Sequence, residues 1–193
     1  MVIGVLALQG GVEEHCDILS LLGAQVRRVR LPQDLEGLDA MVLPGGESSV
    51  VDKLARAFGL AQPLAAAITA GLPTLATCAG LIYCAKRLDN PAPGQRTLGV
   101  LDVTVRRNAF GNQRFSSERL VRVDGVEVEA SFIRAPIVTQ AGAGVEVIAR
   151  SADAQGRPVI VGVRQGNITA LSFHPEENGE AGLHRAWMDS FRG

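Results

Sequence analysis

Cysteine is scarce in this sequence, and the few cysteines fit neither a disulfide framework nor a zinc site. There are three, Cys16, Cys78 and Cys84, with no C-x-x-C pair among them. An odd number of thiols indicates free, reduced cysteines. Cys78 and Cys84 would also project from different faces of a helix with about 3.6 residues per turn, which makes them a poor pair of metal ligands. We therefore expect no metal centre, and each cysteine has to be judged by itself.

Long apolar runs and clusters of one charge are also missing. The formal net charge is −1, lysine and arginine never gather into a basic run, and no apolar stretch approaches the ~18 residues of a membrane span. The first residues, MVIGVLALQG, lack the charged region and the cleavage site of a secretory signal and instead resemble a strand. The sequence therefore indicates neither a nucleic-acid nor a membrane partner, and we expect a cytoplasmic protein.

The first half of the chain alternates short apolar runs with segments of helix length. This alternation is typical of βαβ units around a mainly parallel sheet. Hydrophobic residues make up 47% of the 193 residues, enough for one sizeable core, so we expect residues 1–193 to form one domain. Strands are predicted at 2–8, 24–31, 39–46 and 72–77, and helices at 12–22, 49–58, 61–70 and 79–88.

The second half has a different pattern, with β-branched and partly alternating runs that predict antiparallel or mixed strands. The turn signals DG at 124–125 and QGN at 165–167 separate some of these runs. A final helix is expected at about 180–192, where Leu183, Trp187 and Phe191 repeat at helical spacing. The runs are TLGVLDVTVRR, RLVRVDGVEVEASFIRA, GVEVIARS, RPVIVGVR and NITALSF.

Cys78 lies where a predicted strand gives way to a predicted helix. The first amides of a helix have no internal partner and carry partial positive charge, which stabilises a thiolate. Ala76, Ala79 and Gly80 lie beside it, and small neighbours are needed where a sharp turn lifts a nucleophile above a sheet, as in the G-x-S-x-G elbow. A buried structural cysteine is the alternative. The other two cysteines lie within predicted helices and are interpreted as small buried hydrophobes.

A cysteine nucleophile needs a base, and one histidine is placed to serve as one. His174 directly follows the last predicted strand, and Pro175 keeps it out of the helical region. In an extended chain His174 and Glu176 project to the same side, so the carboxylate can orient the imidazole. For this segment alone, a surface turn is the alternative. His15 and His184 lie on predicted helices and are interpreted as surface residues.

The segment LPGGESSV (43–50) offers backbone donors for an oxyanion. Gly45 and Gly46 allow the backbone to approach a ligand closely, and Glu47 and Ser48 follow them before a predicted helix. A plain turn with a helix cap is the alternative. The lysine of a GxxxxGK[ST] phosphate loop is missing, and no GxGxxG follows the first strand, so neither a phosphate loop nor a dinucleotide site is supported.

Three of these segments, PGGES, TCAGLI and SFHPE, together and in this order resemble the class I (triad-type) glutamine amidotransferases. GVLALQG at the start, RRNAFGNQ (106–113) and SFIRAP (131–136) extend the resemblance to nearly the whole chain. They narrow it to the glutaminase subunits of pyridoxal 5′-phosphate synthase complexes. Two positions depart from that pattern, because Ala76 replaces the usual glycine and Ser49 the usual threonine.

The resemblance implies a three-layer, flavodoxin-like α/β fold with mixed or antiparallel strands in the second half. It implies hydrolysis of L-glutamine to L-glutamate and ammonia through a thioester on Cys78, with His174 as base and acid, Glu176 as its orienter, and no cofactor. The ammonia would pass to a (β/α)8-barrel synthase subunit that makes pyridoxal 5′-phosphate, in vitamin B6 biosynthesis. Glutamine contacts are implied for Gly46, Glu47, Ser48, Arg107, Ile133 and Arg134, and roles in the oxyanion hole or the partner interface for Gln9, Gly10, Gly45 and Ala79.

Two other functions stay open on the sequence. A glutaminase could serve a different acceptor, although the segments RRNAFGNQ and SFIRAP argue against this. A non-catalytic binding module could also use the same scaffold, although an intact set of Cys78, His174 and Glu176 disfavours it.

Overall fold

The computed structural model describes residues 1–110, 117–132, 134–153, 155–177 and 181–192. No helix in these ranges is both long and apolar enough to cross a membrane. The helices are α1 (Val12–Leu21), η1 (Pro32–Leu35, a 3-10 turn), α2 (Ser48–Ala57), α3 (Ala61–Thr69), α4 (Ala79–Cys84) and α5 (Gly182–Asp189). The strands are β1 (Val2–Leu6), β2 (Gln25–Val29), β3 (Ala40–Leu43), β4 (Thr74–Thr77), β5 (Ala85–Leu88), β6 (Leu101–Arg106), β7 (Ser117–Val123), β8 (Val126–Phe132), β9 (Ile137–Ala141), β10 (Glu146–Ala152), β11 (Pro158–Gln165) and β12 (Ile168–Leu171).

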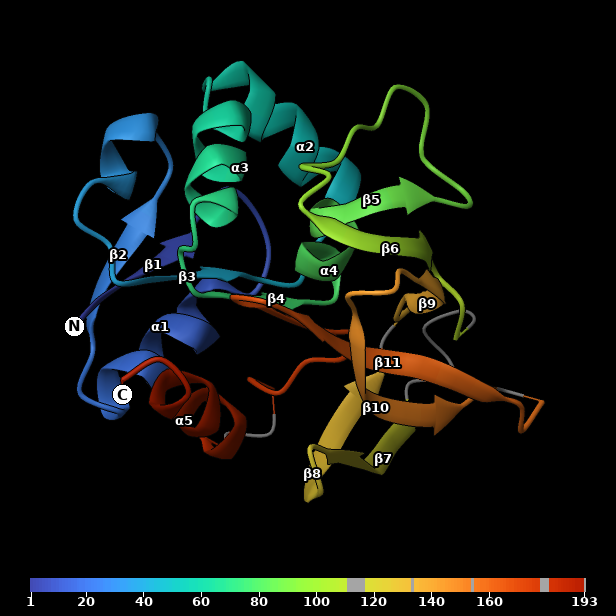
Figure 1. The fold of residues 1–193 in the computed structure, drawn as a ribbon. Coiled ribbons are helices and arrows are strands. Elements are labelled where there is room, and N and C mark those ends of the chain that lie inside the picture. Colours follow the sequence, from blue (N-terminus) through green and yellow to red (C-terminus); the bar gives the residue numbers. More distant parts are fainter. Residues whose placement is uncertain (111–116, 133, 154, 178–180, 193) are drawn as a thin grey trace.

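The strands of the first half form the parallel sheet that the βαβ pattern predicts. Their order is β2-β1-β3-β4-β12, and all four pairs in this row are parallel. Helices α1 and α5 cover one face of this part of the sheet, and α2 and α3 cover the other (Figure 1). The result is the three-layer α/β arrangement that the resemblance implies.

Alternate residues along a buried strand face opposite layers, and β3 shows this clearly. Ala40 and Val42 belong to the hydrophobic cluster beneath α1 and α5, whereas Met41 and Leu43 belong to the cluster beneath α2 and α3. All four are fully buried. Such continuous apolar runs are expected when helices cover both faces of a sheet.

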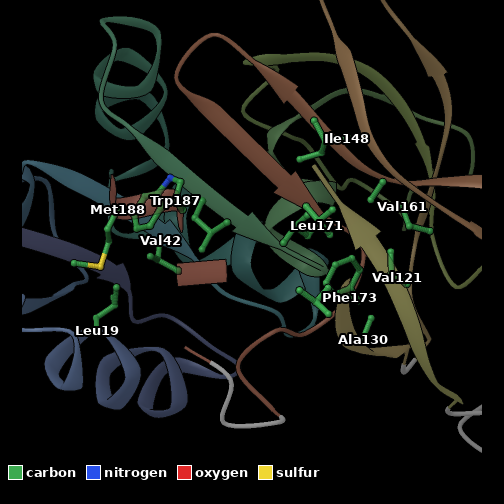
Figure 2. Close-up of a cluster of buried hydrophobic side chains, with 14 of the residues drawn as sticks. Leu19, Val42, Val121, Ala130, Ile148, Val161, Leu171, Phe173, Trp187 and Met188 are labelled. Atoms are coloured by element: carbon green, nitrogen blue, oxygen red, sulfur yellow. The ribbon is translucent and has the colours of Figure 1, made fainter. Parts of the chain in front are cut away.

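The cluster on the α1 and α5 side continues beneath the antiparallel half of the sheet (Figure 2). Leu19 of α1 and Trp187 of α5 contribute at one end, and Val121 and Ala130 of the β7–β8 hairpin contribute at the other. Leu183 and Phe191 pack against this cluster, as their spacing with Trp187 predicts. One apolar layer therefore connects the two halves.

The second half is mainly antiparallel, as predicted. From β12 the sheet continues through β11, β10, β7 and β8, each pair antiparallel. The DG signal forms the β7–β8 turn, where Asp124 and Gly125 both have positive φ, of 49° and 84°. Strand β9, which pairs with β6 and β11, was not among the predicted strands.

The predicted helix at 79–88 is wrong beyond Cys84. The chain leaves the helical region at Ala85, and residues Ala85–Leu88 form β5, which pairs with β6 in parallel. Lysine, arginine and leucine are good helix formers, so here a tertiary strand pairing overrides local propensity. Cys84 is the last residue of α4 rather than a mid-helix residue. It is fully buried, and burial raises the pKa of its thiol to about 12, so its interpretation as a small buried hydrophobe is confirmed.

Candidate active site

Cys78 occupies a sharp turn between β4 and α4. Its backbone has φ 46° and ψ −99°, a conformation that is costly for any residue except glycine. The turn is held because the Cys78 amide donates to the Leu171 carbonyl of β12 at 2.8 Å. A Cβ at Gly80 would lie 2.1 Å from the carbonyl oxygen of Leu43, so glycine lets α4 approach β3 this closely. Strain held in place by its surroundings is typical of functional sites.

Ala76, the departure from the usual glycine, is accommodated. It lies on β4, between Leu43 of β3 and Ala170 of β12, and is fully buried. Its methyl group belongs to the hydrophobic cluster on the α2 and α3 side. The turn at Cys78 therefore forms with alanine at this position.

His174 and Glu176 lie side by side after β12, as their spacing predicts. His174 Nδ1 is 2.8 Å from Glu176 Oε1. The His174 amide also donates to the Ser131 carbonyl of β8 at 3.3 Å, which fixes the extended path. Burial disfavours the imidazolium, but hydrogen bonds and charge interactions with Cys78 and Glu176 outweigh burial and raise the pKa of His174 to about 11. The imidazole is thus held between a thiol and a carboxylate.

Glu176 is a buried carboxylate with two histidine neighbours. Burial alone would raise the pKa of its carboxyl group, but interactions with His15 and His174 hold this pKa well below its usual range. Glu176 is therefore ionised, as the orienting acid of a triad must be.

Two glycine loops meet beside His174. A Cβ at Gly45 would lie 2.1 Å from His174 Cε1, and a Cβ at Gly10 would lie 1.8 Å from the Gly45 carbonyl oxygen. The Gly11 amide donates to that same oxygen at 3.1 Å. Glycine at both positions therefore lets the Gly45 loop approach the imidazole and the Gly10 loop approach the Gly45 loop this closely. The loop after β1 is therefore packed against the loop after β3, at the carboxyl ends of adjacent parallel strands.

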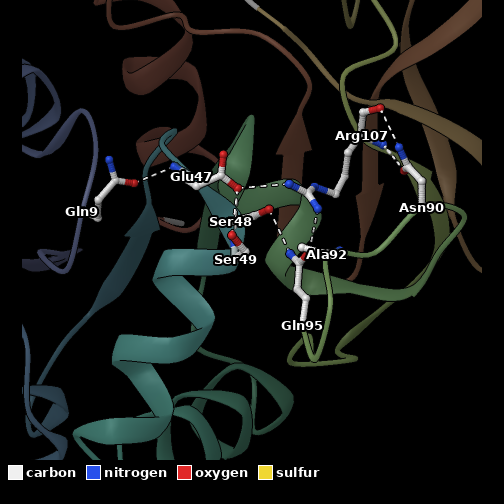
Figure 3. Close-up of polar contacts among 8 residues, drawn as sticks. All are labelled: Gln9, Glu47, Ser48, Ser49, Asn90, Ala92, Gln95 and Arg107. Atoms are coloured by element: carbon white, nitrogen blue, oxygen red, sulfur yellow. Dashed lines mark hydrogen bonds and ion pairs between the residues drawn. The ribbon is translucent and has the colours of Figure 1, made fainter.

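A polar network surrounds Glu47 at the start of α2 (Figure 3). The Glu47 amide donates to Gln9 Oε1, and Glu47 Oε1 accepts from Arg107 Nη2 at 3.0 Å. Gln95 connects the other side of this network, because its Oε1 accepts from Arg107 Nη1 and its Nε2 donates to Ser48 Oγ, each at 2.9 Å. Asn90 exchanges two hydrogen bonds with the Arg107 backbone. Arg107 is thus held firmly in place.

These groups enclose a cavity of about 230 Å³ beside Cys78. Three of the four non-glycine residues with positive φ in the described ranges line it, namely Cys78, Asn108 and Arg134. A larger cavity of about 420 Å³ lies between α2, α3 and residues 96–98, but it contains neither Cys78 nor His174. We therefore take the smaller cavity as the candidate active site. Its lining is Gln9, Gly46, Glu47, Ser48, Cys78, Ile82, Arg107, Asn108, Arg134, His174 and Glu177.

Most of the residues that the sequence predicts for the site meet in this cavity. Gly10, Gly45 and Glu176 instead line a neighbouring cavity of about 280 Å³, which shares Gly46, His174 and Glu177 with the first. Ala79 is buried directly after the nucleophile and is not part of either lining. Ile133 lies outside the described residues, as does the end of the RRNAFGNQ segment.

Several residues of the site were not predicted from the sequence. Ile82, Asn108 and Glu177 line the cavity, and Gln95 and Asn90 hold Arg107. Ile82 could have been found, since it lies one helical turn after Cys78 on the predicted helix. The roles of Gln95 and Asn90 depend on a loop path that no local pattern shows.

Comparisons with a family model and with known proteins indicate the same family. Residues 5–191 match the SNO glutamine amidotransferase family. A pyridoxal 5′-phosphate synthase subunit PdxT from Corynebacterium glutamicum is 61% identical, over 100% of this chain and 96% of its own length. The PdxT subunit of Streptomyces coelicolor is 50% identical, over 99% of this chain and 94% of its own.

Solved structures agree with this result. A crystal structure of a glutamine amidotransferase, 43% identical, superposes with a TM-score of 0.90 and covers 99% of both chains. A further structure, described as PurLQS from Thermotoga maritima, is 19% identical with a TM-score of 0.69, which supports the fold alone.

Proposed function

Because the chain belongs to the SNO glutamine amidotransferase family, we propose that Cys78, His174 and Glu176 form its catalytic triad. The observation that carries this proposal is the His174–Glu176 contact of 2.8 Å beside a cysteine on a strained strand-to-helix turn. Nucleophile, base and orienting acid thus follow the ends of two adjacent parallel strands, β4 and β12.

The chain is the glutaminase subunit of a pyridoxal 5′-phosphate synthase. It hydrolyses L-glutamine to L-glutamate and ammonia, and it supplies the ammonia for vitamin B6 biosynthesis. Two relatives of this type cover 100% and 98% of this chain and 96% and 95% of their own length.

In the first half of the reaction, Cys78 Sγ attacks the side-chain carboxamide carbon of glutamine. His174, whose raised pKa makes it a strong acceptor of the thiol proton, holds that proton and then gives it to the departing nitrogen, so that ammonia leaves and a γ-glutamyl thioester remains on Cys78. Glu176 accepts the Nδ1–H of His174, which leaves Nε2 for the proton transfers and stabilises the imidazolium.

In the second half, water attacks the thioester carbon. His174 removes a proton from this water and returns one to the Cys78 sulfur as the C–S bond breaks. L-glutamate leaves and the enzyme returns to its starting state. Each oxyanion requires backbone donors, and the Ala79 amide, which follows the nucleophile, and the Gln9–Gly10 and Gly45 loops are proposed to supply them.

The zwitterionic end of glutamine requires both signs of charge. Glu47 offers a carboxylate and Arg107 a guanidinium in the cavity wall, and Arg134 lies on the same wall. We assign the ammonium group of glutamine to the Glu47 side and its carboxylate to the arginine side. Gly46 and Ser48 complete this wall, and the contact implied for Ile133 stays a prediction.

The partner's architecture is a further part of the proposal. We propose a (β/α)8-barrel synthase subunit, with the loop at Gln9 and Gly10 near the interface. We also propose that residues 1–193 act as one domain, since the described strands belong to one continuous sheet. A cytoplasmic location belongs to the same proposal, since all three cysteines, Cys78 among them, are free thiols.

The test is ammonia release from L-glutamine, measured for the protein alone and with a barrel-type synthase subunit added. We expect activity with the partner, and we expect Cys78→Ala to abolish it while the protein stays folded. Cys84→Ala is the matched control, because this thiol is buried away from the cavity. Glutamine hydrolysis by Cys78→Ala at the wild-type rate would end the triad proposal.

A further inference from the structure

Two buried histidines lie behind the triad, and the reaction described above does not use them. The interpretation of His15 and His184 as surface residues is wrong, because both are fully buried. His15 comes from α1 and His184 from α5, and their Nδ1 and Nε2 atoms are 2.8 Å apart. Both helices cover the same face of the sheet (Figure 1), and the Glu176 side chain is also buried.

The histidine pair reaches the triad through one nitrogen. His15 Nε2 lies 3.4 Å from Glu176 Oε2 and 3.2 Å from Thr77 Oγ1, and Thr77 immediately precedes Cys78. Glu176 Oε1 is already occupied by His174. No donor among the described residues makes a hydrogen bond of ordinary geometry to Glu176 Oε2. His15 is therefore the group that faces the second oxygen of the catalytic carboxylate.

One arrangement of protons satisfies these contacts. His184 Nε2–H donates to His15 Nδ1, and His15 Nε2–H is shared between Thr77 Oγ1 and Glu176 Oε2. The reverse arrangement places the lone pair of His15 Nε2 against the carboxylate oxygen. It also puts a proton on His184 Nδ1, which has no hydrogen-bond partner among the described residues. A buried N–H without an acceptor is costly, so the first arrangement holds.

The state of His184 fits this arrangement. Burial is the main cause that lowers the pKa of its imidazole, to about 3, and the neighbouring His15 lowers it further. His184 is thus neutral and carries a single ring proton. The arrangement above requires this, because His184 Nε2 donates and His184 Nδ1 carries no proton.

We propose that His15 is a positioning residue for Glu176, and that His184 fixes the tautomer of His15. The inference rests on the proposed triad and extends it to a linear series, His184–His15–Glu176–His174–Cys78. A carboxylate held at only one oxygen can rotate away from the imidazole, whereas one held at both oxygens keeps His174 aligned with Cys78. Hydrogen-bond partners that orient metal-ligating side chains contribute about 10–100-fold to activity, and we expect an effect of the same order from His15.

The experiment compares two substitutions at His15 in the full chain, assayed with its synthase partner and L-glutamine. His15→Leu keeps the volume but removes the donor, and we expect kcat to fall by about 10–100-fold. KM for glutamine should change far less, because His15 does not line the substrate cavity. His15→Gln keeps an N–H near the same place and should recover most of the lost kcat. His184→Gln and His184→Leu should repeat this contrast with smaller effects.

Two controls make the result decisive. Leu19→Ala removes a buried side chain one turn further along α1, away from the triad, so it lowers the melting temperature without touching Glu176. It should keep the wild-type kcat. The proposal is overturned if His15→Leu keeps wild-type kcat, or if His15→Gln is as slow as His15→Leu. Cys78→Ala tests the triad separately, so an inactive Cys78→Ala beside a fully active His15→Leu would end this inference alone.

Discussion

Among single residues, Gly45 is the one where an added side chain would press directly on the His174 imidazole. Its φ is not in the positive region, so alanine would be tolerated by the backbone. The added Cβ, however, would lie 2.1 Å from His174 Cε1 and 2.8 Å from Nδ1, so the imidazole must move. We expect Gly45→Ala to lower kcat by about 100-fold, the cost of misplacing a catalytic group by about 1 Å.

The matched control for this prediction is Gly144→Ala. A Cβ at Gly144 meets nothing within 4 Å, so neither activity nor stability should change appreciably. Circular dichroism should show that Gly45→Ala folds like the wild type, since the atoms in its way belong to a side chain and not to the backbone. An active Gly45→Ala would mean that His174 has a second productive position, contrary to the site described here.

The catalytic residues could be predicted because their evidence is local. Cys78 lies between a strand and a helix with small neighbours, and Pro175 keeps His174 extended beside Glu176. His15 and His184 were misjudged for the opposite reason. Charged residues lie beside both, Glu14 before His15 and Arg185 after His184. Their burial instead follows from residues three and four positions away on the same helix face.

Those spacings are visible in the sequence. His15 precedes Ile18 and Leu19, and His184 precedes Trp187 and Met188, all of them buried. Each histidine is therefore part of an apolar stripe at helical spacing. That the two stripes meet behind Glu176 depends on the packing of α1 and α5 on one face of the sheet, which no local pattern contains.

Among the elements, α4 is the one whose position decides the site, because it begins directly after Cys78. Gly80 lets this helix pack against β3, with the Leu43 carbonyl oxygen 2.1 Å from where a Cβ would be. That oxygen is backbone and cannot turn aside. We expect Gly80→Ala to destabilise the protein by about 1–3 kcal/mol through overpacking, despite alanine's better helix propensity. Urea unfolding followed by circular dichroism measures the change.

Gly182→Ala in α5 is the matched comparison, since it is also a glycine within a helix. A Cβ there meets nothing within 4 Å, so only the propensity effect remains and stability should be unchanged or rise by up to about 1 kcal/mol. Opposite signs for the two substitutions would support the packing explanation. Equal signs would contradict it.

Helices and strands were predictable where apolar residues repeat with a clear helical or strand period, or where a turn signal bounds the segment. The helix predicted at 79–88 continues too far because residues 85–88 pair instead with β6, a strand later in the chain. Strand β9 was missed for a similar reason, since its pairing with β6 and β11 comes from tertiary contacts. Both errors fall where non-local pairing decides the structure.

For the molecule as a whole, the strand order creates the site. Strand β12, the last in sequence, pairs with β4 in parallel, which brings His174 beside Cys78. The loops after β1 and β3 end at the same edge, so Gly10 and Gly45 meet His174 there. Periodicity predicts the strands but not their order, and the meeting of these residues could be expected only from the resemblance to a family.

The buried His184 also gives the whole molecule a pH dependence. Its pKa is lowered from an ordinary value of 6.5 to about 3, first by burial and then by His15, with Glu176 acting in the opposite direction. Unfolding therefore takes up a proton at His184 between these two values. The stability contribution is complete above pH 6.5 and is lost as the pH falls towards 3. The raised pKa of His174 makes the unfolding free energy depend on pH only above pH 6.5, so His174 does not contribute to the change between pH 6.5 and pH 3.

We expect this group to remove about 2 kcal/mol of unfolding free energy between pH 7 and pH 5. His184→Gln cannot take up the proton, yet it keeps an N–H for His15, so its stability should fall less over the same range. Chemical denaturation of both proteins at several pH values measures the difference, and the other carboxylates and histidines are common to both and largely cancel. The unfolding free energy of the wild type should fall more steeply from pH 7 to pH 5 than that of His184→Gln. A pH-independent cost of the substitution would shift the His184→Gln curve as a whole without changing its slope. Parallel curves would show that His184 is not a neutral, buried group in the folded protein.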